Sequence, residues 1–130
     1  MKEALQFLKD AGTFYLATVD GDQPRVRPFG AVAEFEDKLY IITNNEKEVY
    51  KQLEKNPKFE ISGMAKGKWI RLSGEAVRDD RREARKAMLD ANPSLRSMYN
   101  EDDGKVEVLY IQNATVTICS FTDAPVTWQF

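Results

Sequence analysis

The chain has 130 residues, of which 42% are hydrophobic and 31% are charged, and its formal net charge is −2. This length and composition are typical of one globular domain, so we expect residues 1–130 to form a single unit. The slightly negative charge argues against a protein that coats nucleic acid or binds an anionic membrane. Any anion-binding site is therefore expected to be confined to a small part of the surface.

The chain contains no histidine and a single cysteine, Cys119. The absence of histidine excludes histidine-based acid–base catalysis, histidine-ligated haem and histidine-containing zinc sites. One cysteine can form neither an internal disulfide nor a CxxC redox pair. Because neither a membrane-spanning apolar run nor a signal-peptide pattern is present, we expect a reducing, cytoplasmic setting.

The first half of the chain is predicted to start with a helix and to continue as antiparallel strands. Apolar residues at helical spacing predict a helix over the first dozen residues, and Gly12 ends it. An apolar run at 14–19, a turn and an extended segment at 25–35 predict a hairpin. A further short turn leads into a third strand at 39–43, which favours an antiparallel meander.

The rest of the chain adds two helices and further strands. Asn45 and Glu48 resemble a capping pair and predict a helix over residues 46–55. Asp79 and Asp80 are predicted to cap another helix whose apolar stripe faces the sheet, followed by one or two more helical turns. The expected strands occupy residues 59–64, 69–77, 107–111 and 114–121.

These elements together define the expected fold class. They amount to six or seven strands and three helices, and most strands follow one another directly in the sequence. We therefore expect a mainly β fold of the α+β class, a closed or nearly closed antiparallel barrel with flanking helices outside it. Because even an eight-stranded barrel is only just wide enough for its own side chains, a ligand is expected to bind outside the barrel.

A cluster of basic residues predicts an anion site. Arg25 and Arg27 lie two apart on a predicted strand, so both guanidinium groups emerge from one face and suit a phosphate. Pro28 cannot donate a ladder hydrogen bond, which favours an edge or bulge with free main-chain groups. The helix after the third strand offers unpaired N–H groups at its start, where Lys47 and Lys51 add charge. Since the second and third strands are predicted neighbours, we expect these groups to converge.

The same residues also have ordinary structural interpretations. Two arginines on an exposed edge can simply be solvated, and Glu46 and Glu48 can satisfy the helix dipole without a ligand. Trp69 can pack in the core or cover a planar ligand. The mixed charges of residues 78–86 are expected to form a solvated helix face with internal ion pairs.

Several segments, in their order and spacing, carry a family resemblance. They are FYLAT at 14–18, PRVRPF at 24–29, LYIIT at 39–43, the lysine-bearing helix closed by Asn56 and Pro57, and WIRLSGEA at 69–76. In these segments the chain resembles the pyridoxamine 5′-phosphate oxidase-like FMN-binding family, in particular its small bacterial members. The resemblance implies a six- to seven-stranded antiparallel split barrel, a homodimer, and FMN bound in two equivalent grooves at the dimer interface.

The resemblance also implies which residues bind the cofactor. By it, the segment from Arg25 to Phe29 lines the flavin and its ribityl chain, largely through main-chain atoms. The strand end at 42–44 faces the flavin or its phosphate, and Lys47 and Lys51 hold the phosphate. The expected cofactor-binding residues are Arg25, Val26, Arg27, Pro28, Phe29, Ile42, Thr43, Asn44, Lys47, Lys51 and Trp69. No residue identifies itself as a catalytic acid or base, and no metal site is expected.

The function that the resemblance implies is that of a flavoprotein. Its FMN is expected to pass a hydride or electrons between a reduced nucleotide and a small acceptor, because the cofactor supplies the redox chemistry and needs no histidine. Two alternatives stay open. One is a relative of the same fold that uses a deazaflavin, and the other is a small-barrel binding or sensing module without enzymatic activity.

Overall fold

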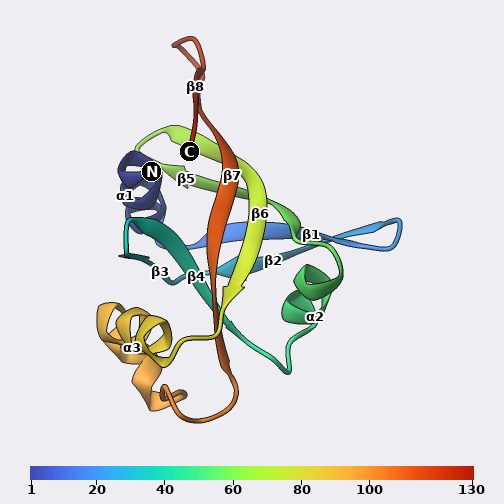
Figure 1. The fold of residues 1–130 in the computed structure, drawn as a ribbon. Coiled ribbons are helices and arrows are strands. Elements are labelled where there is room, and N and C mark those ends of the chain that lie inside the picture. The colour runs from blue at the N-terminus through green and yellow to red at the C-terminus, as the bar shows by residue number, and fades with distance from the viewer.

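The computed structural model describes residues 1–130 and shows one twisted antiparallel sheet with helices packed around it (Figure 1). No helix is both long enough and apolar enough to cross a bilayer. The elements, in chain order, are α1 (Lys2–Ala11), β1 (Phe14–Asp20), β2 (Gln23–Phe29), β3 (Val32–Phe35), β4 (Lys38–Asn44), α2 (Glu48–Lys55), β5 (Lys58–Ala65), β6 (Lys68–Asp79), α3 (Arg82–Ala91), the 3₁₀ helix η1 (Pro93–Ser97), β7 (Val106–Ser120) and β8 (Val126–Gln129).

The strands form an incompletely closed barrel. Their order in the sheet is β2-β1-β5-β6-β7-β4-β3, and β8 pairs with β7 off this path. All pairings are antiparallel. β2 and β3 follow each other in the sequence but lie at opposite ends of the strand order and do not pair, so the curled sheet stays open between them. The mainly β class and the antiparallel split barrel are thus confirmed.

The predicted meander was wrong. The extended segment at 25–35 is divided into β2 and β3 because the chain leaves the sheet at Gly30 and Ala31. β4 pairs with β3 on one side and with β7 on the other, and it does not extend the β1–β2 hairpin. The short connection between β2 and β3 therefore did not make these two strands pair.

The strand count was also too low, since the sheet has eight strands rather than six or seven. The two strands predicted at 107–111 and 114–121 are the single long strand β7, with an irregularity at Asn113, whose φ is 52°. Gly74 of β6 lies opposite, and a Cβ atom there would come 3.0 Å from the carbonyl oxygen of Gln112. β8 was not predicted as a strand.

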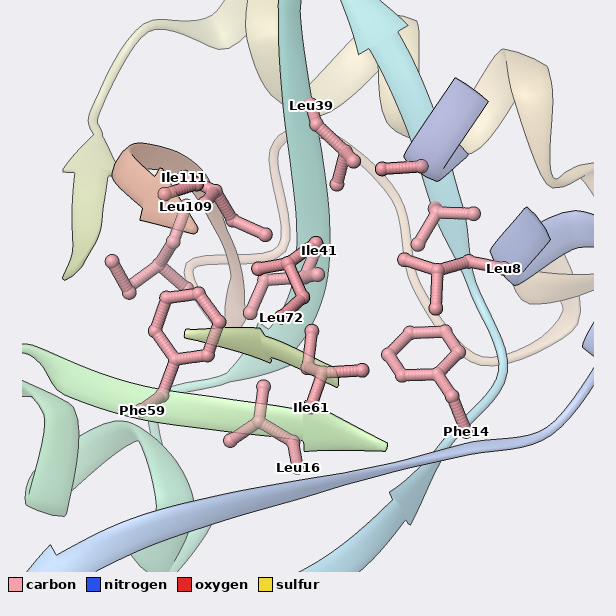
Figure 2. Close-up of a cluster of buried hydrophobic side chains, with 14 of the residues drawn as sticks. Leu8, Phe14, Leu16, Leu39, Ile41, Phe59, Ile61, Leu72, Leu109 and Ile111 are labelled. Carbon is pink, nitrogen blue, oxygen red and sulfur yellow. The ribbon is translucent and has the colours of Figure 1, made fainter. Parts of the chain in front are cut away.

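The barrel interior is filled by aliphatic and aromatic side chains from α1 and from the strands (Figure 2). Leu16, Ile41, Ile61, Ile70 and Leu72 have no exposed surface. Each such side chain contributes about 1.5–3 kcal/mol by its burial. The packed interior agrees with the expectation that a ligand binds outside the barrel.

Helix α3 lies against the outer side of the sheet. Its apolar stripe, Ala84, Met88 and Leu89, is fully buried in a second cluster that includes Tyr40 and Val108. The predicted stripe also included Ala87, which is half-buried, and Ala91, which is exposed, and it omitted Leu89, so the amphipathic pattern predicted the buried face of α3 only in part. This packing also holds η1, which follows α3 directly, beside the open edge of the barrel.

Candidate functional site

A pocket of about 310 Å³ lies outside the barrel. Its lining residues come from β2 and the chain that follows it, from the end of β4, from the start of α2, and from the segment that joins α3 to η1 and beyond. Six of the residues predicted to bind a cofactor line it, namely Arg27, Pro28, Phe29, Ile42, Thr43 and Lys47. The predicted convergence of the arginine strand and the α2 start therefore occurs, although β2 and β4 are not paired.

Arg25 and Lys51, also predicted to bind the cofactor, do not line this pocket. The Nε atom of Arg25 lies 3.1 Å from a carboxylate oxygen of Asp20 at the end of β1. The Nζ atom of Lys51 lies 3.5 Å from the carboxylate of Glu48, one turn earlier on α2. Both cations thus have acidic partners on their own element or hairpin.

Val26, Asn44 and Trp69 also lie outside the set of pocket residues. Val26 points away from the barrel and is 67% exposed. Asn44 donates a hydrogen bond to the Tyr99 hydroxyl over 2.7 Å, which ties the end of β4 to a pocket residue. Trp69 packs on Phe121 with ring centroids 5.1 Å apart. The roles predicted for these three residues in cofactor binding stay predictions.

Arg27 has an unusual electrostatic environment. Of all the arginines in the chain, it alone has no carboxylate within ion-pair distance. Its Nη1 atom donates to the Leu16 carbonyl over 3.3 Å and to the Thr18 hydroxyl over 2.7 Å, and Nη2 donates to the Gln52 side-chain oxygen over 2.7 Å. Partial burial, together with the charge of nearby Arg25, lowers the pKa of Arg27, but the guanidinium stays charged at neutral pH.

Thr43 is buried, with 5% of its surface exposed, and its hydroxyl has no hydrogen-bond partner. An unpaired buried hydroxyl costs about 1–3 kcal/mol, so such groups are rare and often belong to binding sites. Thr43 and Lys47 both line the pocket, which makes this hydroxyl a candidate contact for a ligand there.

The start of α2 adds a further source of positive potential. The helix begins after Lys47, whose backbone is extended, and no side chain caps it. The predicted cap by Asn45 was wrong, because the Asn45 amide donates instead to the Gly104 carbonyl and to Glu107. Lys47 itself has no ion-pair partner. An uncapped helix start and a free lysine both favour an anion.

The far wall of the pocket was missed by the sequence analysis. It consists of residues in and beside η1, namely Asn92, Ser94, Leu95, Met98 and Tyr99. The sequence predicted only extra helical turns in this region. The 67% exposure of Met98 is visible only in the structure, so no sequence signal marked this wall.

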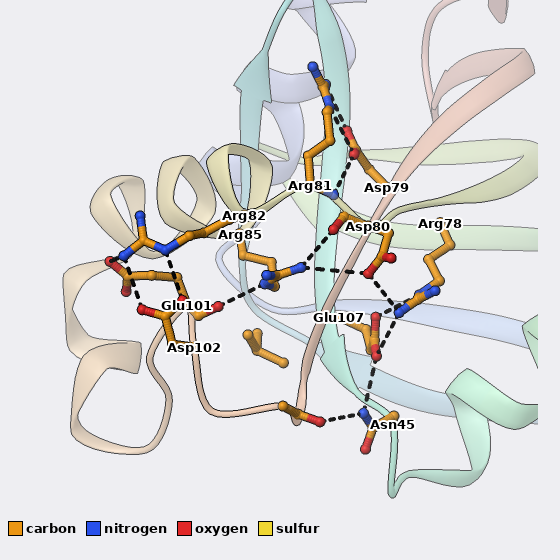
Figure 3. Close-up of polar contacts among 12 residues, drawn as sticks. Asn45, Arg78, Asp79, Asp80, Arg81, Arg82, Arg85, Glu101, Asp102 and Glu107 are labelled. Atoms are coloured by element: carbon orange, nitrogen blue, oxygen red, sulfur yellow. Dashed lines mark hydrogen bonds and ion pairs between the residues drawn. The ribbon is translucent and has the colours of Figure 1, made fainter.

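In the second basic region, next to α3, the arginines are paired with carboxylates, unlike Arg27 at the pocket (Figure 3). Arg78 pairs with Glu107 at 2.8 Å, and Arg81 pairs with both Asp79 and Glu36 at 2.9 Å. Residues 78–86 do contain internal ion pairs, as expected, but residues 78–81 precede the helix, and further pairs reach carboxylates on other elements. No group of acidic and cysteine side chains is arranged to hold a metal ion.

Asp79 links this network to the buried core. It accepts a 2.6 Å hydrogen bond from the Tyr40 hydroxyl and further bonds from the side chain and backbone of Arg81. Hydrogen bonds from Arg81 lower the pKa of Asp79, whereas burial and the hydrogen bond to Asp79 raise the pKa of Tyr40. The charges of this region are thus used to fix α3 on the sheet.

Comparisons with known proteins place the chain in a family. The family model described as pyridoxamine 5′-phosphate oxidase matches residues 1–119. The chain therefore belongs to the pyridoxamine 5′-phosphate oxidase family. It is also 57% identical to a NimC/NimA family protein from Clostridium acetobutylicum, whose crystal structure superimposes with a TM-score of 0.98 over 100% of this chain and 92% of that chain.

More distant structures share the fold. A pyridoxamine 5′-phosphate oxidase-related, FMN-binding protein from Nostoc punctiforme is 16% identical, with a TM-score of 0.66 over 99% of this chain and 93% of that one. A heme-binding protein from Mycobacterium smegmatis is 20% identical, with a TM-score of 0.75 over 98% of this chain and 56% of that one. No match was found among curated proteins.

Proposed function

We propose that this protein binds FMN in the pocket beside β2 and uses it as an oxidoreductase, passing a hydride or electrons between a reduced nucleotide and a small acceptor. The observation that carries the proposal is Arg27, a half-buried cation without a carboxylate partner. It lines the same pocket as Lys47 and the unpartnered hydroxyl of Thr43. Membership of the pyridoxamine 5′-phosphate oxidase family supports the same cofactor class.

The residues present suit both parts of FMN. A phosphate accepts charge-assisted hydrogen bonds, and Arg27, Lys47 and Thr43 supply donors beside an uncapped helix start. No aspartate or glutamate lines the pocket, so a phosphate would meet no repelling carboxylate there. Seven of the 14 lining residues are hydrophobic, which suits a flat ring system.

When bound, FMN supplies the hydride or electron transfer, and the protein has to bind, orient and shield it. Arg27 and Lys47 would hold the phosphate, and the main chain from Pro28 to Ala31 would face the ring system. The apolar side chains of the η1 wall would exclude water. We assign no catalytic acid or base, since no carboxylate or thiol lines the pocket.

We further propose that the protein is a homodimer whose second copy completes the pocket. The β1–β2 hairpin projects from the barrel (Figure 1), and its outward face carries no charge. Pro28 belongs both to this face and to the pocket lining, so a second copy on the face would also cover the pocket. The outward residues, paired across the two strands, are Tyr15 with Pro28, Ala17 with Val26, and Val19 with Pro24.

The cofactor proposal is tested by titrating the purified protein with FMN, riboflavin, a deazaflavin cofactor and haem. We expect a yellow complex that binds FMN at least about tenfold more tightly than riboflavin, because the phosphate adds charge-assisted hydrogen bonds. Equal affinities for FMN and riboflavin would refute the phosphate site. Tighter binding of the deazaflavin or of haem would show that this ligand, and not FMN, is the cofactor. Binding of none of the four ligands would favour a module without a cofactor.

The dimer proposal is tested by sedimentation of the apo and FMN-loaded forms. We expect a symmetric dimer whose stability increases with FMN, since a ligand stabilises the form that binds it. Val26→Glu, which puts a charge on the proposed interface, is expected to weaken both dimer and FMN binding. A monomer that retains stoichiometric, tightly bound FMN would contradict the shared site.

A further inference from the structure

The guanidinium of Arg27 is held entirely by uncharged groups. Three of its five N–H bonds are directed to the Leu16 carbonyl, the Thr18 hydroxyl and the Gln52 amide oxygen. The Nε–H and one N–H of Nη2 have no partner in the protein. Arg27 is therefore oriented by its neighbours while two donors and its full charge stay available.

Thr18 and Gln52 form a small buried polar pair behind this arginine. Thr18 is 3% exposed on β1, and Gln52 is 8% exposed on α2 between the buried positions of Val49 and Leu53. The Thr18 hydroxyl donates to the same Gln52 oxygen that accepts from Arg27, so the three side chains form a closed hydrogen-bonded triangle. Burying an amide on an apolar helix face is costly unless the amide is hydrogen-bonded. Here the amide oxygen of Gln52 accepts hydrogen bonds from Arg27 and Thr18.

The choice of glutamine at this position has an electrostatic consequence. A carboxylate of the same length would accept the same hydrogen bonds, and every other arginine in the chain is paired with one. A buried ion pair would, however, cancel the charge of Arg27 before any ligand arrived. An amide fixes the geometry of the guanidinium and leaves its charge intact.

We propose that Thr18 and Gln52 are positioning residues for Arg27, which orient its guanidinium and, being uncharged, preserve its charge for a phosphate monoester. This inference rests on the proposed binding of FMN. It makes the Thr18–Gln52 pair a determinant of specificity for the phosphorylated cofactor over its unphosphorylated form.

The main test is Gln52→Glu, measured as the ratio of riboflavin to FMN dissociation constants. The introduced carboxylate would pair with Arg27, so we expect FMN affinity to fall about tenfold or more while riboflavin affinity changes less than about twofold. Gln129→Glu makes the same chemical change at an exposed position on β8 and is expected to leave both affinities unchanged.

Two further measurements separate positioning from general structural damage. Thr18→Val keeps the side-chain shape but removes one acceptor of Arg27, so we expect a smaller loss that is again confined to FMN. In an Arg27→Ala background, Gln52→Glu should cause little additional loss of FMN affinity, because its effect acts through the guanidinium.

The outcomes distinguish this inference from the cofactor proposal. If wild-type protein prefers FMN but Gln52→Glu and Thr18→Val retain that preference, the positioning role is wrong and the phosphate site stands. Two results would show a merely structural role and overturn the inference. One is an equal loss of FMN and riboflavin affinity in both variants. The other is a loss of FMN affinity from Gln52→Glu that is as large in the Arg27→Ala background as in the wild-type background. If wild-type protein does not prefer FMN over riboflavin, the phosphate site itself fails, and this inference fails with it.

Discussion

The two basic regions of this protein use arginine in opposite ways. Beside α3, Arg81 and its neighbours are bound by carboxylates from several elements (Figure 3). Beside β2, Arg27 is bound by a carbonyl, a hydroxyl and an amide and has no carboxylate partner. The first arrangement cancels charge and fixes a helix, whereas the second retains charge at a pocket. The number of arginines in a segment therefore says less about anion binding than the identity of their partners.

The largest expected effect on stability is that of Asp79→Ala, in the charge-cancelling region. The change leaves the buried Tyr40 hydroxyl without its acceptor and removes a carboxylate from Arg81. We expect a loss of about 3 kcal/mol in the free energy of unfolding, measured with urea, and no change in FMN affinity. Asp80→Ala, at an exposed neighbour, should cost less than about 1 kcal/mol. Equal losses for the two variants would contradict the expectation that Asp79, as the acceptor of the buried Tyr40 hydroxyl, contributes more to stability than Asp80.

Arg27→Ala is expected to weaken FMN binding and to leave stability almost unchanged, which is the opposite of the effect of Asp79→Ala. FMN binding should weaken by about 2 kcal/mol, or roughly 30-fold, because a charged donor to the phosphate is lost. The unfolding free energy of the apo protein should change by less than about 1 kcal/mol. Arg25→Ala is the matched control, since Arg25 pairs with Asp20 outside the pocket. A loss of FMN affinity in the control as large as that in Arg27→Ala would restore the sequence-based role of Arg25.

The pH dependence of stability is expected to come in part from the α3 region. The folded-state pKa of Asp79 is lowered below its usual 3.8, so its contribution is complete above that value and is lost as the pH falls towards the lower, folded-state pKa. Urea unfolding from about pH 5 to about pH 2 should therefore show falling stability. Asp79→Asn should flatten this decline, whereas an unchanged slope would show that other carboxylates account for it.

The smallest expected effect is that of Thr43→Val, which removes the unpartnered pocket hydroxyl. FMN affinity should fall by about 1 kcal/mol, close to fivefold, because one donor to the phosphate is lost. The apo protein should be as stable as wild type or up to about 1 kcal/mol more stable, since a buried hydroxyl without a partner is removed. A less stable apo variant would indicate that the hydroxyl is satisfied in solution.

The sequence by itself determined most of the local elements and the basic residues of the pocket. Periodicity of two or 3.6 residues predicted the helices and most strands, because burial of one face requires that spacing. The sequence also predicted that Arg27 and Lys47 converge, and the pocket contains both, although the strand pairing on which this prediction rested does not occur. The spacing of residues along one helix or strand decides which side chains share a face, so the shared face can be predicted without knowledge of the fold.

Only the tertiary structure decided which groups meet across the chain. β4 pairs with β7, more than 60 positions away, and the η1 wall reaches the pocket only because α3 packs on the sheet. Tertiary contacts likewise gave Arg25 a carboxylate partner and Arg27 the neutral Gln52. Two arginines that are equivalent by spacing thus became different, since hydrogen-bond partners and burial depend on residues that are distant in sequence.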